Sequence, residues 1–355
     1  MADEDAYFDR LVDEERLETY LESTLGPADT FDVSYHGEGN SNEVLFVTWG
    51  SRDLVLRRPP PGETADTAHD VLREYRVVSA LQETPVPVPT TVLACEDHSV
   101  LGCDFYLMER LEGDVMFEEP ERFATSAHRR AVGEELISTL ASLHGIDYEA
   151  AGLADFGRPD GFTQRQVDRW TKQYDWIASK TSHERSVPDL EATRDWLREN
   201  VPEGTERTIV HGDFRLDNML FAPGTPPKLA GVLDWELSTL GDPLTDLGFL
   251  LVHWCDPDDE HPPAIPEWNS PYTSRDGYLT RAELVDRYEA ATGIAFENER
   301  FYRALAVYKE AVAGEVFYAR HLEGETGDPL YPLMKDRVPA QAERAVRIIE
   351  GEEPL

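Results

Sequence analysis

The chain has 355 residues, of which 41% are hydrophobic, so it can bury a sizeable core and its composition excludes a wholly disordered protein. Its 70 acidic and 33 basic residues give a formal net charge of −37, far more than solubility requires. The acids are spread along the chain and no basic stripe is present, which disfavours nucleic acid as a partner, and no window is long and apolar enough for a membrane.

Lysine is scarce, with five lysines among the 33 basic residues. An acidic, lysine-poor composition resembles that of proteins from salt-in halophiles such as haloarchaea, where solvent salt shortens the Debye length to about 3 Å at 1 M. Alternatively, a basic partner protein could offset the negative charge, but we would then expect the acids to be clustered in one block. The start, MADEDAYFDR, lacks the features of a signal peptide, and three cysteines without metal-like spacing suit a reducing cytosol. We therefore expect a cytoplasmic protein.

The first third of the chain predicts a small β-rich region. A short amphipathic helix over residues 13–25 ends at Gly26 and Pro27. The segment FDVSYHGEGNSNEVLFVTWG predicts a strand, a turn and a second strand, with Gly37 and Gly39 in the turn. Glycines allow a backbone to approach phosphates and donate N–H groups. On its own, the motif is equally explained by an ordinary hairpin turn.

A third strand and a helix follow. Residues 53–58 alternate so that Val55 and Arg57 share one face of the strand. The segment AHDVLREYRVVSAL has apolar residues at helical spacing and carries Glu74, which we expect to pair with Arg57. The alternative is that Glu74 is a solvated helix acid. Further on, FYLMERLEGDV predicts an apolar strand that leads to a turn at Gly113.

The chain changes character after about Asp114, where long segments with helical periodicity dominate, such as 127–144, 165–179 and 300–321. We interpret His144, which extends an apolar stripe, as a core or cap residue. Several residues of these helices are candidates to line an acceptor pocket, although such aromatic side chains more often belong to a core: Trp170, Tyr174, Trp176, Phe317, Tyr318 and Arg320.

The segment IVHGDFRLDNMLFAPGTPPKLAGVLDWE holds the most informative pattern. Asp213 lies in a polar loop after an apolar run, and the apolar segments 219–222 and 229–233 around PGTPP predict a hairpin. A hairpin would place Asn218 beside Asp234, and amide and carboxylate oxygens suit Mg²⁺. Phosphoryl transfer needs a carboxylate to hold the attacking hydroxyl and oxygen ligands for the metal. The spacing therefore predicts a kinase.

With these motifs, HGDFRLDN and DWE, the chain resembles the aminoglycoside phosphotransferase family, which includes choline and homoserine kinases. The resemblance implies an α+β, protein-kinase-like fold with two lobes. Residues 1–113 would form the N-terminal helix, the nucleotide-binding β-rich lobe and the hinge, and residues 114–355 the helical catalytic and substrate-binding lobe. ATP and Mg²⁺ are the cofactors that it implies.

The same resemblance assigns the catalytic roles. Asp213 is the catalytic base, and Asn218 and Asp234 bind Mg²⁺. Glu236 is either an assistant of the metal or a cap of the following segment. Asp246, in GDPLTDLG, is the structural anchor of the catalytic loop.

For the nucleotide, the resemblance implies that the turn covers the phosphates, with Arg57 in place of the usual lysine and Glu74 as its partner. A guanidinium pairs with phosphate oxygens in a different geometry from an ammonium. Arg58 is the alternative to Arg57. At the hinge, the Glu109 carbonyl and the Leu111 N–H would meet the adenine edge. The residues of the covering turn are Gly37, Gly39, Asn40, Ser41 and Asn42.

The predicted function is an ATP- and Mg²⁺-dependent kinase for a hydroxyl group of a small molecule. VLRRPPPG and CEDHSVLGCDFYLMERLEG resemble the phosphotransferase domain fused to some acyl-CoA dehydrogenases, which favours a hydroxyacyl-CoA-like acceptor. An aminoglycoside or choline-type kinase and a catalytically silent nucleotide-binding regulatory module remain alternatives. A protein kinase is disfavoured, because DWELSTLGDPLTDLG leaves no room for an activation segment before the next apolar helix. The oligomeric state is left open.

Overall fold

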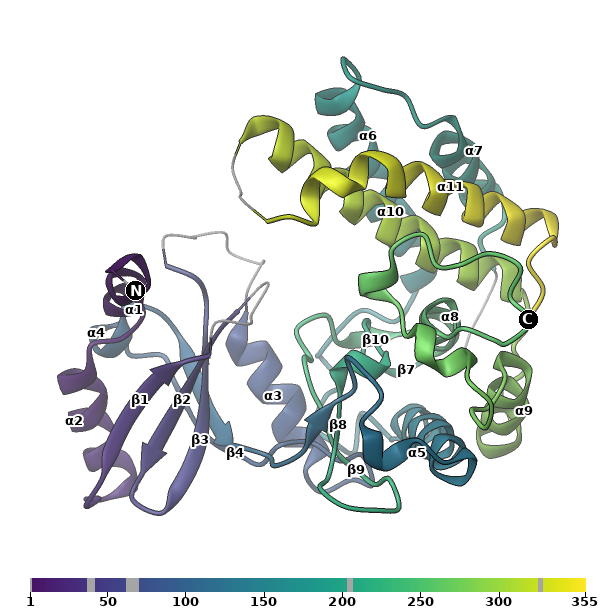
Figure 1. Ribbon diagram of the computed structural model, residues 1–355. Helices are drawn as coiled ribbons and strands as arrows, with labels where there is room; N and C mark the ends of the chain where they lie inside the picture. Colours follow the sequence, from purple (N-terminus) through teal and green to yellow (C-terminus); the bar gives the residue numbers. More distant parts are fainter. Residues whose placement is uncertain (1, 37–41, 62–69, 203–206, 325–327) are drawn as a thin grey trace. The chain divides into compact units, whose positions relative to one another are not determined.

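The computed structural model describes residues 2–36, 42–61, 70–202, 207–324 and 328–355. The chain forms two compact units (Figure 1). The first comprises Met1–Gly113 and Ala230–Ser238, and the second comprises Asp114–Leu229 and Thr239–Leu355. The chain passes from the second unit to the first within strand β9 (Leu229–Val232).

The first unit is built on a five-stranded antiparallel sheet in the order β1-β2-β3-β5-β4. Aromatic and β-branched residues are frequent in these strands, as in β2, EVLFVTW. The strands are β1 (Phe31–Tyr35), β2 (Glu43–Trp49), β3 (Arg52–Arg58), β4 (Thr91–Cys95) and β5 (Phe105–Glu109). The helices are α1 (Ala2–Leu11), α2 (Glu14–Leu25), α3 (Val71–Leu81) and α4 (His98–Leu101).

The two faces of this sheet are covered by different helices, because side chains alternate along each strand. Leu54 and Leu56 of β3 belong to a core cluster that includes Leu17 of α2. Val55, which points the other way, packs in a second cluster with Val71 of α3. Figure 1 shows α3 on one side of the sheet and α1, α2 and α4 on the other. The α3 side is therefore the face on which β3 presents Arg57.

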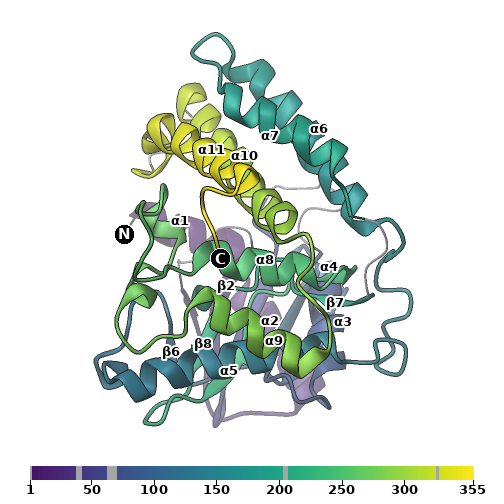
Figure 2. The same cartoon turned by 90° about the vertical axis from the view of Figure 1, so that its right-hand side faces the viewer.

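The second unit is mostly helical. Its helices are α5 (Ser126–His144), α6 (Phe162–Thr181), α7 (Pro188–Glu199), α8 (Leu244–His253), α9 (Arg281–Thr292), α10 (Glu299–Glu323) and α11 (Met334–Glu350). Short strands accompany them: β6 (Asp114–Val115), β7 (Thr208–Val210), β8 (Met219–Phe221) and β10 (Thr239–Gly241). The long helix α10 packs against α6, α7, α8 and α11, and α5 lies beside α9 (Figure 2).

The predicted α+β class is confirmed, since a β-sheet and many helices are present and each predicted long helix has its counterpart. The helix predicted over residues 13–25 is confirmed as α2, and a further helix that was not predicted, α1, precedes it. The predicted hairpin after the HGDFRLDN loop is present, since Ala222 N–H donates to the carbonyl oxygen of Lys228 (2.9 Å) in the turn between β8 and β9. Within the described ranges, no helix is both long and apolar enough to traverse a bilayer.

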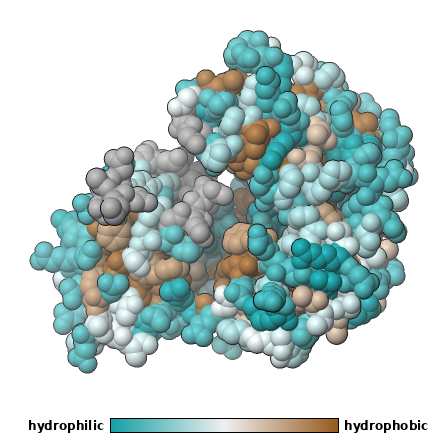
Figure 3. Space-filling model, viewed as in Figure 1, coloured by the Kyte–Doolittle hydropathy of each residue, from teal (hydrophilic) through white to brown (hydrophobic). Residues whose placement is uncertain are grey.

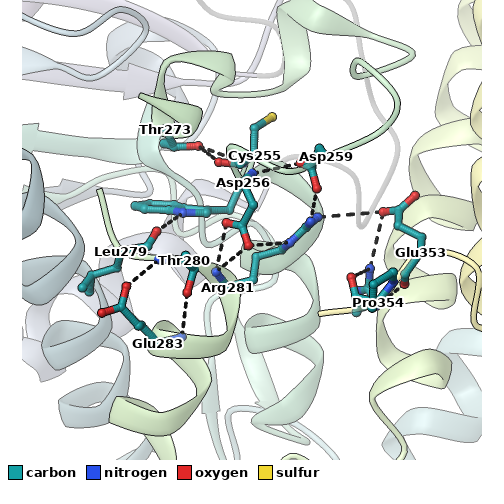
Figure 4. A network of polar contacts seen from close by, with 12 residues as sticks. Cys255, Asp256, Asp259, Thr273, Leu279, Thr280, Arg281, Glu283, Glu353 and Pro354 are labelled. Atoms are coloured by element: carbon teal, nitrogen blue, oxygen red, sulfur yellow. Dashed lines mark hydrogen bonds and ion pairs between the residues drawn. The ribbon is translucent and has the colours of Figure 1, made fainter. Parts of the chain in front are cut away.

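Many acids of this acidic chain lie on its surface, and hydrophilic residues cover most of the face of the second unit in Figure 3. The interior of the second unit, by contrast, contains buried arginines. Arg281 and Arg303 are 4% and 0% exposed, and Glu353 in the C-terminal segment accepts from Arg344 Nε (3.0 Å) and Arg303 Nη2 (3.4 Å). Arg281 also pairs with Asp259 (Figure 4). Buried charges are tolerated when paired in this way, and the network ties the C-terminal segment to α9, α10 and α11.

We predict that Gly248→Ala will destabilise the protein. Gly248 lies in α8, and a Cβ there would be 2.7 Å from Tyr302 Cβ and 2.9 Å from the Tyr302 carbonyl carbon, so α8 or α10 would have to move. Overpacking of this kind costs about 1–3 kcal/mol in the free energy of unfolding, measurable by urea denaturation at constant salt. Gly145→Ala is the matched control, because its Cβ would make ordinary contacts of 3.4 Å and 3.6 Å. Equal stability of the two variants would contradict the packing argument.

Candidate active site

A buried cluster of charges in the first unit joins β3, α3 and the segment after β9. Arg57 Nη1 lies 3.1 Å from Glu74 Oε1, and Arg57 Nη2 lies 3.1 Å from Asp234 Oδ1. Arg57 is 8% exposed and Glu74 is 2% exposed. The predicted pairing of Arg57 with Glu74 is confirmed, and the alternative of a solvated Glu74 is wrong because α3 turns this residue toward the sheet.

Burial is the main influence on the ionisation of this cluster. Burial raises the pKa of Glu74, Arg57 opposes this effect and the Asp234 carboxylate adds to it, so that the net pKa is about 7. Burial lowers the pKa of Arg57, but the Glu74 carboxylate and the other acidic groups around it together outweigh that effect, and the net pKa is raised. Arg57 is therefore a permanent cation between two carboxylates.

The neighbouring Arg58 lies on the opposite face of β3. Its Nη1 donates to the carbonyl oxygens of Leu11 and Leu101, and its Nε donates to the carbonyl oxygen of Pro59 (3.1 Å). Arg58 thus anchors loops on the face covered by α1, α2 and α4. Of the two arginines, Arg57 is the one that shares a face with Glu74 and Asp234.

Asp234 has an unusual backbone. Its φ of 63° lies in the left-handed region, which aspartate tolerates better than most residues. The next residue, Trp235, is 2% exposed and donates its backbone N–H to Glu74 Oε1 (3.2 Å). The turn that holds the Asp234 carboxylate at Arg57 is therefore itself held by α3. Strained backbone of this kind is frequent at functional sites.

The remaining nucleotide candidates are only partly described. Asn42 donates from Nδ2 to Glu236 Oε2 (3.3 Å), whereas the predicted Gly37, Gly39, Asn40 and Ser41 lie outside the described residues. At the predicted hinge, Glu109 Oε1 accepts from Arg52 Nε (3.0 Å). Leu111 lies so close to Gly231 that a Cβ there would be 2.4 Å from Leu111 Cδ1. The contacts predicted between adenine and the backbone of Glu109 and Leu111 stay predictions.

The second unit holds the HGDFRLDN loop between β7 and β8. Asn218 ends a 3₁₀ turn (Leu216–Asn218), and its Nδ2 donates both to Asp213 Oδ2 (2.8 Å) and to the Asp213 carbonyl oxygen (2.8 Å). The structure thus brings Asp213 and Asn218 together. Because Nδ2 makes these two bonds, the amide oxygen of Asn218 is the atom that suits a hard cation.

Arg215 is a site residue to which the sequence interpretation assigned no role, although it stands in the HGDFRLDN motif. Its Nε lies 3.3 Å from Asp213 Oδ1 and 3.0 Å from Asp217 Oδ1, and its Nη1 donates to the carbonyl oxygen of Trp268 (3.2 Å). Burial acts to raise the pKa of Asp213, but Arg215 and, after it, His211, His253 and the hydrogen bond from Asn218 together outweigh burial, and the net pKa is lowered. Asp213 is therefore ionised at neutral pH.

The loop is anchored by Asp246, at the start of α8. Its Oδ2 accepts from His211 N (2.6 Å) and its Oδ1 accepts from Gly212 N (2.8 Å). His144, the predicted core residue, lies behind this carboxylate, 3.4 Å from Nε2 to Asp246 Oδ2, and its Nδ1 is 2.7 Å from Tyr288 Oη. The predicted anchor role of Asp246 and the core role of His144 are confirmed.

The aromatic residues predicted to line an acceptor pocket differ in burial and in their contacts. Tyr174 and Tyr318 are each 3% exposed and belong to the core, whereas Trp176 is 49% exposed. Phe317 stacks on Tyr331 with a ring separation of 4.5 Å. Trp170 faces a lysine of α10, as described below. Because Asn218 belongs to the second unit and Asp234 to the first, the Mg²⁺ site that they would share stays a prediction.

Comparison with known proteins identifies the class. Residues 32–305 match the phosphotransferase enzyme family, and the chain belongs to that family. Acyl-CoA dehydrogenase family member 11 of Homo sapiens is 33% identical over 347 residues, which cover 95% of this chain but 43% of the relative. The chain therefore spans less than half the length of that curated relative.

Two solved structures share the fold. A protein of Ralstonia eutropha JMP134, provisionally assigned as an aminoglycoside phosphotransferase, is 31% identical with a TM-score of 0.81, over 96% of this chain and 99% of that one. The GDP complex of aminoglycoside 2'-phosphotransferase-IIIa is 15% identical, with a TM-score of 0.60, over 94% of this chain and 99% of that one. The second likeness concerns the fold alone, and the two structures together confirm the predicted protein-kinase-like fold.

We predict that Asp246→Asn will loosen the catalytic loop and destabilise the second unit. An amide presents one acceptor oxygen, so one of the two buried N–H groups would lose its partner, at about 1–3 kcal/mol. Burial acts to raise the pKa of Asp246, but His144 and His211 lower it below the ordinary 3.8 overall. Its contribution to stability is therefore complete above pH 3.8 and lost as the pH falls through the folded-state pKa.

The measurement is the free energy of unfolding of both proteins between pH 3 and 7. The variant should be less stable at pH 7, and the difference should shrink toward acid. Asp286→Asn is the control, since Asp286 is an exposed acid of α9. A deficit that grows toward acid would contradict the anchor role.

Proposed function

We propose that this chain is an ATP- and Mg²⁺-dependent kinase that transfers a phosphoryl group to a hydroxyl of a small molecule. The observation that carries the proposal is the geometry of the HGDFRLDN loop. There Asn218 Nδ2 lies 2.8 Å from Asp213 Oδ2, and Asp246 holds the loop by two backbone N–H groups. Phosphoryl transfer requires a fixed, ionised carboxylate for the attacking hydroxyl and a nearby oxygen ligand for the metal.

In the proposed mechanism, Asp213 orients the acceptor hydroxyl and takes its proton as the hydroxyl oxygen bonds to the γ-phosphorus of ATP; the bond from that phosphorus to the bridging oxygen breaks, and ADP leaves. Asn218 and Asp234 would hold Mg²⁺, which suits their oxygen donors and, when bound, neutralises charge on the phosphates. Arg57 and Glu74 order the nucleotide side, the turn 37–42 covers the phosphates, and the backbone of Glu109 and Leu111 binds adenine.

The arrangement of the first unit supports the nucleotide roles. Glu74 is buried and holds both Arg57 and the Trp235 N–H, so the cation and the turn of Asp234 are fixed by one carboxylate of α3. Preorganised charges act more strongly than mobile ones, because they need no rearrangement during the reaction. The Asn42–Glu236 hydrogen bond links the end of the covering turn to the segment that carries Asp234.

For the acceptor, likeness to an acyl-CoA dehydrogenase family member supports a hydroxyacyl-CoA-like metabolite. An aminoglycoside or choline-type acceptor is the second candidate, supported by the likeness to the Ralstonia protein. A catalytically silent regulatory module is less well supported, because such modules lose residues that Asp213, Asn218 and Asp234 supply here. We further propose that residues 1–113 and 114–355 act as the two lobes, and that the protein works in the cytoplasm.

We predict that Asp213→Asn will reduce turnover at least 100-fold, because the acceptor hydroxyl loses its base, a function typically worth about 10²–10⁴ in rate. Nucleotide affinity should change little, because Asp213 is assigned to the hydroxyl. The assay is acceptor-dependent ADP release at about 2 M KCl, which screens the surface charge. Asp258→Asn, at an exposed acid, is the control. Unchanged turnover would remove Asp213 from the base role.

We predict a different result for Asp234→Ala, which removes a metal ligand and a partner of Arg57. The affinity for Mg-nucleotide should fall at least tenfold, whereas affinity for metal-free nucleotide should not fall, because the carboxylate repels phosphates in the absence of metal. Isothermal titration with and without Mg²⁺ separates the two effects. Asp29→Ala, at an exposed acid of the first unit, is the control. Equal losses with and without Mg²⁺ would contradict a metal role for Asp234.

A further inference from the structure

Lys309 occupies an unusual position within the second unit. It lies on α10, which packs against both α6 and α8. Its Nζ is 5.7 Å from the ring centroid of Trp170 on α6 and 5.0 Å from that of Phe249 on α8. A lysine ammonium at these distances is attracted to the negative faces of aromatic rings. The three helices therefore hold one cation at a defined place.

The ammonium of Lys309 lacks a polar partner among the residues that the structure describes, whether a hydrogen-bond acceptor or an ion-pair carboxylate. In a chain with 70 acids, this is unexpected. The other lysines behave ordinarily. Lys180 pairs with Glu323 (3.1 Å) and Lys228 with Glu135 (3.6 Å), and Lys172 and Lys335 are exposed.

Helix α8, whose Phe249 faces this cation, also carries Asp246, which holds the catalytic loop through two backbone N–H groups. Burial lowers the pKa of Lys309, and the carboxylates of Asp213 and then Asp246 act against that effect without cancelling it. Arg169, on α6, is a second cation whose field acts on Lys309. Three donor hydrogens that are partly removed from water need acceptors. A ligand that supplies an oxyanion would satisfy them.

Resting on the proposed function, we infer that Lys309 binds an oxyanion of the acceptor, a carboxylate or a phosphate. The acceptor is then a hydroxylated acid, whose hydroxyl meets Asp213 while its oxyanion meets the ammonium between Trp170 and Phe249. A compact ammonium suits this role because it offers three rotatable donors to an anion. A cationic acceptor such as choline or an aminoglycoside would instead meet a like charge.

The positive charge of Lys309 also counteracts an electrostatic repulsion in the site. Asp213 has to remain ionised, and an anionic substrate placed beside it in a partly dry environment would be repelled. Lys309 supplies a positive charge there, and among the residues that the structure describes it has no carboxylate as an ion-pair partner. This selection for acids acts through one residue of α10, and it leaves nucleotide binding by the first unit unaffected.

The test compares the full-length chain with Lys309→Met, which keeps the length of the side chain and removes its charge, and Lys309→Arg, which keeps the charge. Binding to each protein is titrated with 3-hydroxybutyrate, 3-hydroxybutyryl-CoA, glycerol 3-phosphate, glycerol, choline and kanamycin, in the presence of Mg²⁺ and a non-hydrolysable ATP analogue. The first three probes distinguish a carboxylate from a phosphate source. Lys172→Met, at an exposed lysine, is the matched control.

We expect at least one anionic probe to bind the unmodified chain more tightly than glycerol or choline, and Lys309→Met to weaken it about tenfold or more, as for the loss of a charge-assisted hydrogen bond. Lys309→Arg should retain most of the affinity, and the affinity for the ATP analogue should stay the same in every variant. In turnover assays with that acceptor, the loss should appear in KM.

Three results would overturn the inference: preference for a cationic or neutral probe, no anionic probe bound, or equal anion affinity in Lys309→Met. A fall in kcat for every acceptor without a change in KM would also overturn it, because Lys309 would then only position Asp213. A different result would refute the proposed kinase function. Anion binding that depends on Lys309 without ADP release would leave the inference standing and refute the kinase.

Discussion

The proposed chemistry depends on one carboxylate that takes no part in it. Asp246 accepts the backbone N–H groups of His211 and Gly212, and this fixes the chain just before Asp213. A loop held by its own backbone keeps its catalytic side chain in place without a large entropic cost at each turnover. The apolar helix α8 supplies that carboxylate, and Gly248 lets α8 approach α10 closely, so the position of the loop rests on the packing of the helical core.

The charge of the chain shapes the site in a second way. Two buried arginines have carboxylates as partners: Arg57 has Glu74 and Asp234, and Arg281 has Asp256 and Asp259. Lys309 departs from this rule. In a uniformly acidic protein, the informative residues are therefore the few basic ones and the partners that each of them has.

Much of this was predictable from the sequence, because the informative residues stand at fixed offsets in turns and strand ends. The HGDFRLDN and DWE spacing, the alternation that puts Val55 and Arg57 on one face, and the helix that carries Glu74 all depend on local geometry. Local sequence patterns could not predict the features that depend on tertiary packing. The burial of Glu74, the separation of Arg57 from Arg58 to opposite faces, and the place of Lys309 between α6 and α8 follow from packing. The roles of Arg215 and α1 were likewise missed, since neither has a distinctive periodic signal.

The central claim is the proposal that Asn218 and Asp234 are metal ligands for phosphoryl transfer to the hydroxyl at Asp213. A crystal structure with Mg²⁺ and a non-hydrolysable ATP analogue tests it most directly. The account predicts a Mg²⁺ ion with oxygen atoms of Asn218 and Asp234 at about 2.0–2.1 Å, bridging to the phosphates. A bound nucleotide whose metal contacts neither residue would contradict the account.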